Sequence, residues 1–73
     1  MNCRVKWFLE QAEFIDADVF IFDKDNNVVF KCIDGFSVND PKCPIPDDEI
    51  MRQSIDFWTL DATTGTPILK IFL

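Results

Sequence analysis

The chain has 73 residues, of which 48% are hydrophobic, and its thirteen acidic and seven basic residues give a net charge of −6. This length and apolar content indicate one small domain spanning residues 1–73 and exclude a disordered chain. No apolar run approaches the roughly 20 residues of a membrane-spanning helix, and no signal peptide is visible. Because the basic residues are scattered singly, we expect no direct binding to nucleic acid and no membrane association.

The N-terminal segment alternates apolar and polar residues over most of the stretch from Cys3 to Glu10, and Cys3, Val5, Trp7 and Leu9 would share one face of a strand. Such alternation favours a half-buried β-strand. A helix is the competing interpretation, because Val5, Phe8 and Leu9 also fit a period of 3.6 residues. We expect a strand here, with the helix as the alternative.

Two β-hairpins are predicted because one pattern occurs twice. Four mostly apolar residues stand between aspartates at 18–23 and again at 56–61, and each run leads through a polar turn into a second apolar run. The pattern fits an internal duplication. Unrelated hairpins also resemble one another, because strands and turns use few residue types, and we favour this second explanation. The predicted strands are 17–23, 28–33, 55–61 and 67–73.

The segment between the hairpins is predicted to be a loop followed by a short helix. Three of the four prolines fall between Phe36 and Pro46, where they favour a loop. A proline and three acidic residues at 46–49 indicate a helix start, so a helix is expected at 46–54. The fold class is therefore mainly β, or small α+β. It has about five antiparallel strands, in two hairpins plus the N-terminal strand, and one short helix.

Consecutive apolar residues in the predicted strands place hydrophobic side chains on both faces of the sheet. Both faces then need cover, from the chain itself or from another subunit. We therefore expect a homo-oligomer that associates through a strand edge or a sheet face. The candidate contact residues are the aromatic residues Phe36 and Trp58 and two residues of the last apolar run, Ile71 and Leu73.

Catalytic machinery is not expected. The chain lacks histidine and has two glycines, so it offers neither the commonest general base nor a phosphate-binding loop. Cys3, Cys32 and Cys43 form no CxxC unit and have no histidine to complete a zinc site. Cys3 and Cys32 lie in strand-like runs, which indicates core positions, and the odd number of cysteines indicates a reducing compartment, the cytoplasm. We predict no enzyme, no catalytic residues, no metal site and no cofactor.

A partial calcium-loop pattern runs through 23–34. Asp23, Asp25 and Asn27 are followed by Asp34 at the twelfth position, as in an EF-hand loop. The sixth position is Val28 instead of glycine, and a strand from that residue would separate the ends of the loop. A polar hairpin turn is the favoured interpretation, and a weak calcium-binding module at 23–34 is an alternative function.

The preferred hypothesis is a non-enzymatic, acidic protein-interaction domain that self-associates. Its size and acidity would suit an accessory protein of a bacterium or phage. The other alternative is an acidic inhibitor that mimics nucleic acid toward a basic protein. That hypothesis predicts acidic residues gathered on one face, among them Asp16, Asp18, Asp47, Asp48 and Glu49.

Overall fold

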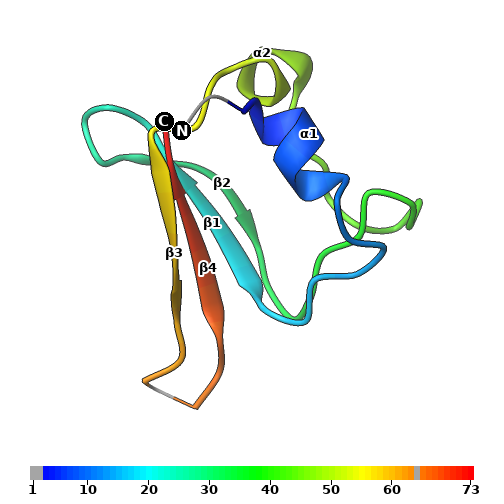
Figure 1. Cartoon of the computed structure of the whole chain (residues 1–73). Helices are drawn as coiled ribbons and strands as arrows, with labels where there is room; N and C mark the ends of the chain where they lie inside the picture. The colour runs from blue at the N-terminus through cyan, green and yellow to red at the C-terminus, as the bar shows by residue number, and fades with distance from the viewer. Residues whose placement is uncertain (1–2, 64) are drawn as a thin grey trace.

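The computed structural model describes residues 3–63 and 65–73, which form a four-stranded β-sheet with two short helices on one side of it (Figure 1). The sheet confirms the prediction of a small, mainly β fold, and its strands lie within the predicted ranges. In chain order the elements are α1 (Val5–Leu9), β1 (Asp18–Phe22), β2 (Val28–Cys32), α2 (Asp48–Met51), β3 (Phe57–Asp61) and β4 (Ile68–Phe72). Neither described helix is long or apolar enough to cross a membrane.

The two hairpins lie side by side in the order β2-β1-β4-β3. β1 and β4 meet at the centre as a parallel pair, from Asp18 opposite Ile68 to Phe22 opposite Phe72. The expectation of an entirely antiparallel sheet was therefore wrong. After β2 the chain crosses to the far edge, forms β3 there and returns as β4 beside β1, and such a crossover allows parallel pairing.

The N-terminal segment is a helix, so the described chain has four strands instead of five. Val5 and Leu9 are one helical turn apart and fully buried, whereas Trp7 between them is 57% exposed. A strand would have placed all three side chains on one face. Among the described residues of this segment, the one β-type backbone pairing is an isolated bridge between Arg4 and Ser54.

The one predicted helix is present as α2 and is shorter than the expected 46–54. Asp47 is its N-cap, and the carboxylate accepts a hydrogen bond of 2.9 Å from the backbone N–H of Ile50. Asp48 and Glu49 occupy the first turn, as the acidic run predicted, and Met51 reaches the core.

The core lies between the sheet and the helices. Alternate residues of the two central strands point inward, namely Val19 and Ile21 of β1 and Leu69 and Ile71 of β4. Helix and loop residues cover them from the other side: Val5, Leu9, Phe36, Met51 and Ile55. Only this face of the sheet is covered by the described helices.

Candidate functional site

Four phenylalanines form a continuous stack on the face of the sheet opposite the helices. Phe57 and Phe72 lie 4.4 Å apart between ring centroids and 11° from parallel, and Phe72 and Phe22 lie 5.0 Å and 12° apart. Phe20 extends the row at 6.3 Å from Phe22. Strand pairing creates the stack, because Phe57, Phe72 and Phe22 are direct partners across three strands. We call this surface the phenylalanine face.

The phenylalanine face is locally neutral on an acidic molecule. Two lysines, Lys31 and Lys70, and two aspartates, Asp18 and Asp61, lie on this face. Successive side chains of a strand point to opposite faces, and these four alternate with the residues that face the core. Lys70 lies 3.9 Å from the Asp61 carboxylate. The rings remain accessible to a partner, since Phe57 is 52% exposed and the other three are half-buried.

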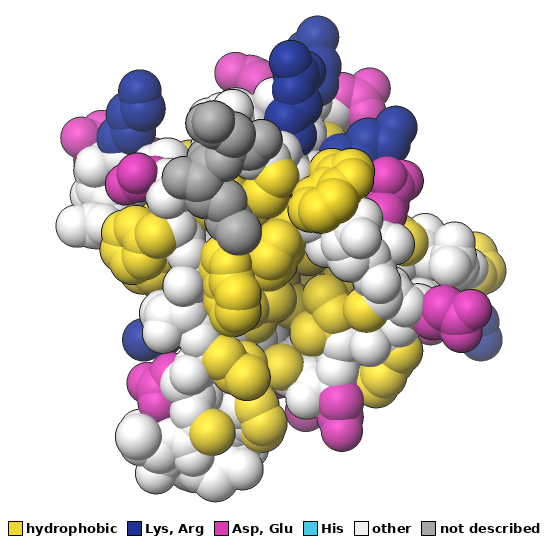
Figure 2. Space-filling view, viewed as in Figure 1, with side chains coloured by type: hydrophobic (Ala, Val, Ile, Leu, Met, Phe, Trp, Pro, Cys, Tyr) yellow, Lys and Arg dark blue, Asp and Glu magenta, His cyan; other side chains and the backbone are white. Residues whose placement is uncertain are grey.

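A second apolar surface is a groove between α1 and the edge strand β3, which we call the α1–β3 groove. Figure 2 shows hydrophobic side chains gathered between the sheet, on the left, and α1, on the right. The Phe8 and Trp58 rings meet across it with their centroids 5.4 Å apart. The lining residues are Trp7, Phe8, Gln11, Ala12, Ile15, Trp58, Leu60 and Leu69.

The four contact residues expected from the sequence do not form one surface, although Trp58 and Ile71 are direct partners across β3 and β4. Phe36 is 1% exposed and Ile71 is fully buried, so both belong to the core and neither reaches the surface. The Phe36 ring packs in the core with its edge against Phe30, at 6.0 Å between centroids, and the Phe36 backbone exchanges hydrogen bonds of 2.8 and 2.9 Å with Ile15. Trp58 lines the α1–β3 groove, and Leu73 is half-buried beyond β4.

The sequence reasoning missed Phe20, Phe22, Phe57 and Phe72. The available signal was the run of apolar residues that predicted two hydrophobic faces. Which positions face outward depends on where the helices pack, and the strand pattern alone does not contain that information.

The predicted calcium loop is a hydrogen-bonded turn. Asp23 Oδ1 accepts from the backbone N–H groups of Asp25 and Asn27, both at 2.9 Å. These bonds hold the pKa of the Asp23 carboxyl below its usual value, and the bond from the Asn27 backbone has the largest effect. Asp34 lies beyond the other end of β2, and the described residues contain no group of three or more potential metal ligands. The geometry gives no support to calcium binding.

The acidic residues do not gather on one face. Asp16 and Asp18 border a hollow with Asp34 at the start of β1. Asp47 and Glu49 border another hollow with Asp23, which follows the opposite end of that strand. This separation gives no support to a nucleic-acid mimic.

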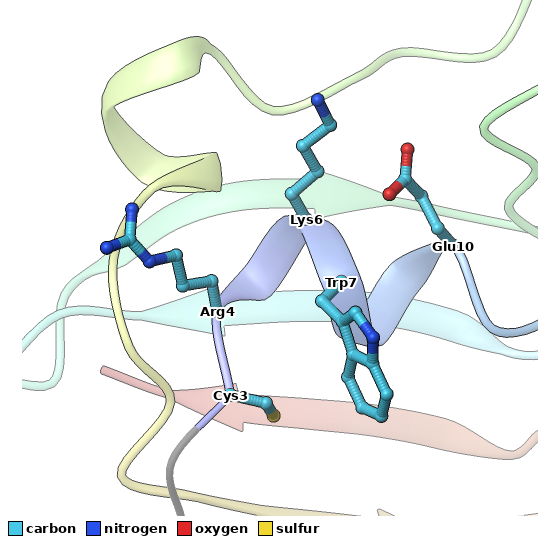
Figure 3. A pocket seen from close by; sticks show the side chains of 5 residues that line it. All are labelled: Cys3, Arg4, Lys6, Trp7 and Glu10. Carbon is cyan, nitrogen blue, oxygen red and sulfur yellow. The ribbon is translucent and has the colours of Figure 1, made fainter.

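A third hollow lies beside the start of α1 and is lined by Cys3, Arg4, Lys6, Trp7 and Glu10 (Figure 3). Its charged side chains do not converge, since Arg4 points away from Lys6 and Glu10. The Trp7 and Lys6 side chains point in opposite directions from α1. No common point for holding a ligand is formed there.

Comparison with known proteins finds no relative of this chain: no family model matches it, and no curated protein or solved structure matches it significantly. The function is therefore inferred from the geometry of the chain itself.

Proposed function

We propose that this chain is a non-enzymatic protein-interaction domain that binds a second copy of itself through the phenylalanine face. The supporting observation is the continuous four-ring stack on a sheet face that the described helices leave uncovered. Aromatic side chains supply much of the apolar contact in protein interfaces, and stacked pairs add to that stabilisation. The three cysteines are free thiols, which fits action in the cytoplasm.

The size of the face predicts a weak dimer. Strands of five residues in a four-stranded sheet offer a surface about 16 Å long and roughly 19 Å wide. Two such faces in contact cover on the order of 600 Å², below the roughly 1,000 Å² that a stable, specific interface buries. We therefore expect reversible, concentration-dependent association.

The charges favour a second copy over a basic partner. The two lysines and two aspartates of the phenylalanine face cancel, so two copies meet there without local repulsion. A two-fold axis parallel to the strands would set β2 of one copy against β3 of the other. Lys31 of each copy then approaches the strand that carries Asp61 in the other.

Neighbouring residues of β3 provide the test. Phe57→Lys places a charge in the ring stack, whereas Trp58→Lys places the same charge on the opposite side of the same strand. Both native side chains are substantially exposed, at 52% and 42%. Sedimentation velocity over a wide concentration range should show a wild-type dimer that Phe57→Lys weakens about tenfold or more.

Trp58→Lys should leave the dimer constant unchanged within about twofold. Thermal unfolding of both variants checks that each remains folded. A wild-type protein that stays monomeric at high concentration would contradict the proposal. So would the reverse ranking of the variants, which would move the interface to the α1–β3 groove.

A further inference from the structure

Two cysteine sulfurs are in contact on the helix side of the sheet. Cys32 ends β2, and Cys43 lies in the loop that follows it, with the two Sγ atoms 3.7 Å apart. The Cys32 thiol donates to the Gly35 carbonyl at 3.1 Å, and the Ser37 N–H donates to Cys43 Sγ at 3.4 Å. These bonds hold the sulfurs next to each other although eleven positions separate the residues.

We propose that Cys32 and Cys43 form a reversible disulfide when the protein meets a small-molecule disulfide such as oxidised glutathione. The sulfurs must approach from 3.7 Å to the roughly 2.05 Å of a disulfide bond. Cys43 belongs to no helix or strand, so its loop can supply the movement. Cys3 is the remaining thiol and provides an internal comparison.

The solvent exposure of the two sulfurs determines which cysteine reacts with the oxidant first. Cys43 is half-buried and can be reached by the oxidant, whereas Cys32 is 4% exposed. Burial, followed by the hydrogen bond with Cys43, raises the pKa of the Cys32 thiol to about 11. Cys32 therefore remains a thiol while Cys43 reacts first.

The exchange proceeds in two balanced steps. The Cys43 thiolate attacks one sulfur of glutathione disulfide, which expels a glutathione thiolate and leaves a mixed disulfide on Cys43. Cys32 then loses its proton to solvent, and its thiolate attacks Cys43 Sγ and expels the second glutathione thiolate. Each glutathione thiolate takes up one proton. The two protein thiols lose two electrons, and the glutathione disulfide gains them.

The bond would fasten the loop between positions 32 and 43 to the sheet. This loop carries Phe36, which is almost fully buried in the core. A disulfide that closes such a loop restricts the unfolded chain. The oxidised protein should therefore unfold about 5 °C or more above the reduced protein.

Trypsin provides a direct test, because cleavage after Arg4, Lys31, Lys42 and Arg52 separates the three cysteines into peptides 1–4, 32–42 and 43–52. After incubation of the Cys3→Ser variant with glutathione disulfide, intact-mass measurement should show the loss of two hydrogens. Mapping of the wild type should show peptides 32–42 and 43–52 joined, with peptide 1–4 outside the cross-link. Dithiothreitol should restore both thiols.

Cys3→Ser should retain the cross-link, and Cys43→Ser should abolish it together with the increase in melting temperature. Decay of the mixed disulfide should accelerate as pH rises above 7, because burial favours the protonated form of Cys32 and only its thiolate can attack Cys43 Sγ. Glutathione that remains on Cys43 without closure would overturn the proposal, as would a cross-link through Cys3. Neither outcome depends on the phenylalanine face.

Discussion

At the scale of single residues, the aspartates at the end of the first strand of each hairpin, Asp23 just after β1 and Asp61 as the last residue of β3, have the same role. Asp23 caps its turn through the backbone N–H groups of Asp25 and Asn27, and Asp61 accepts from the N–H and hydroxyl of Thr63 at 3.0 and 2.7 Å. The pKa of each carboxyl is lowered, chiefly by the backbone bonds. The sequence placed these residues at strand ends, and the hydrogen bonds add a turn-stabilising function.

Replacing Asp23 with asparagine should reduce the acid sensitivity of folding. A carboxyl with a lowered pKa in the folded state binds fewer protons there than in the unfolded chain, so its stabilisation is full above its unfolded pKa and is lost as pH falls through its folded pKa. Urea unfolding between pH 7 and pH 2 should therefore show a shallower loss of stability for Asp23→Asn than for the wild type. Identical profiles would show that the turn carboxylate has no such role.

At the scale of elements, α1 shows where local pattern becomes ambiguous. Its segment satisfies an alternating and a helical period at once, and the strand was the wrong choice. Tertiary packing decides between them, because the helix buries Val5 and Leu9 together against the sheet and leaves Trp7 mostly in solvent.

Two alanine substitutions distinguish the helix from a strand. Leu9→Ala removes a fully buried side chain and should lower the free energy of unfolding by about 2–5 kcal/mol. Trp7→Ala, on the exposed side, should cost less than about 1 kcal/mol. Chemical denaturation of both variants measures the difference. Comparable losses at the two positions would indicate that both side chains share one buried face, as in a strand.

The hairpins were predictable because their strands and turns are encoded locally, and the observed strands fall within the predicted ranges. Their mutual arrangement was not predictable, since the parallel contact joins residues that lie fifty positions apart in the sequence, such as Asp18 and Ile68. Equivalent positions of the two patterns even face opposite ways. Val19 and Phe57 both follow a framing aspartate, yet Val19 is buried in the core and Phe57 joins the phenylalanine face.

At the scale of the whole molecule, the net charge of each copy opposes the proposed dimer, whereas the balanced charges of the phenylalanine face do not. Each copy carries a net charge of −6, so two copies repel one another at a distance. The apolar contact and the balanced charges of the phenylalanine face act at close range.

Salt should therefore strengthen self-association. Increasing ionic strength from about 20 mM to 500 mM shortens the screening length from roughly 20 Å to about 4 Å, which suppresses long-range repulsion. Sedimentation equilibrium should show a dimer constant several-fold tighter at high salt. A complex held together by attraction to a basic partner would respond with the opposite sign. Weaker self-association at high salt would contradict a contact dominated by stacked rings.

The tryptophans and the stacked phenylalanines lie on opposite sides of the sheet, so tryptophan fluorescence arises from one surface of the molecule. The chain contains two tryptophans and no tyrosine, and both indole side chains line the α1–β3 groove. The stacked phenylalanines lie on the other side of the sheet. Tryptophan emission therefore reports on the groove and receives no contribution from the phenylalanine face. A partner that binds the groove should shift the emission directly, whereas a partner on the phenylalanine face touches neither indole.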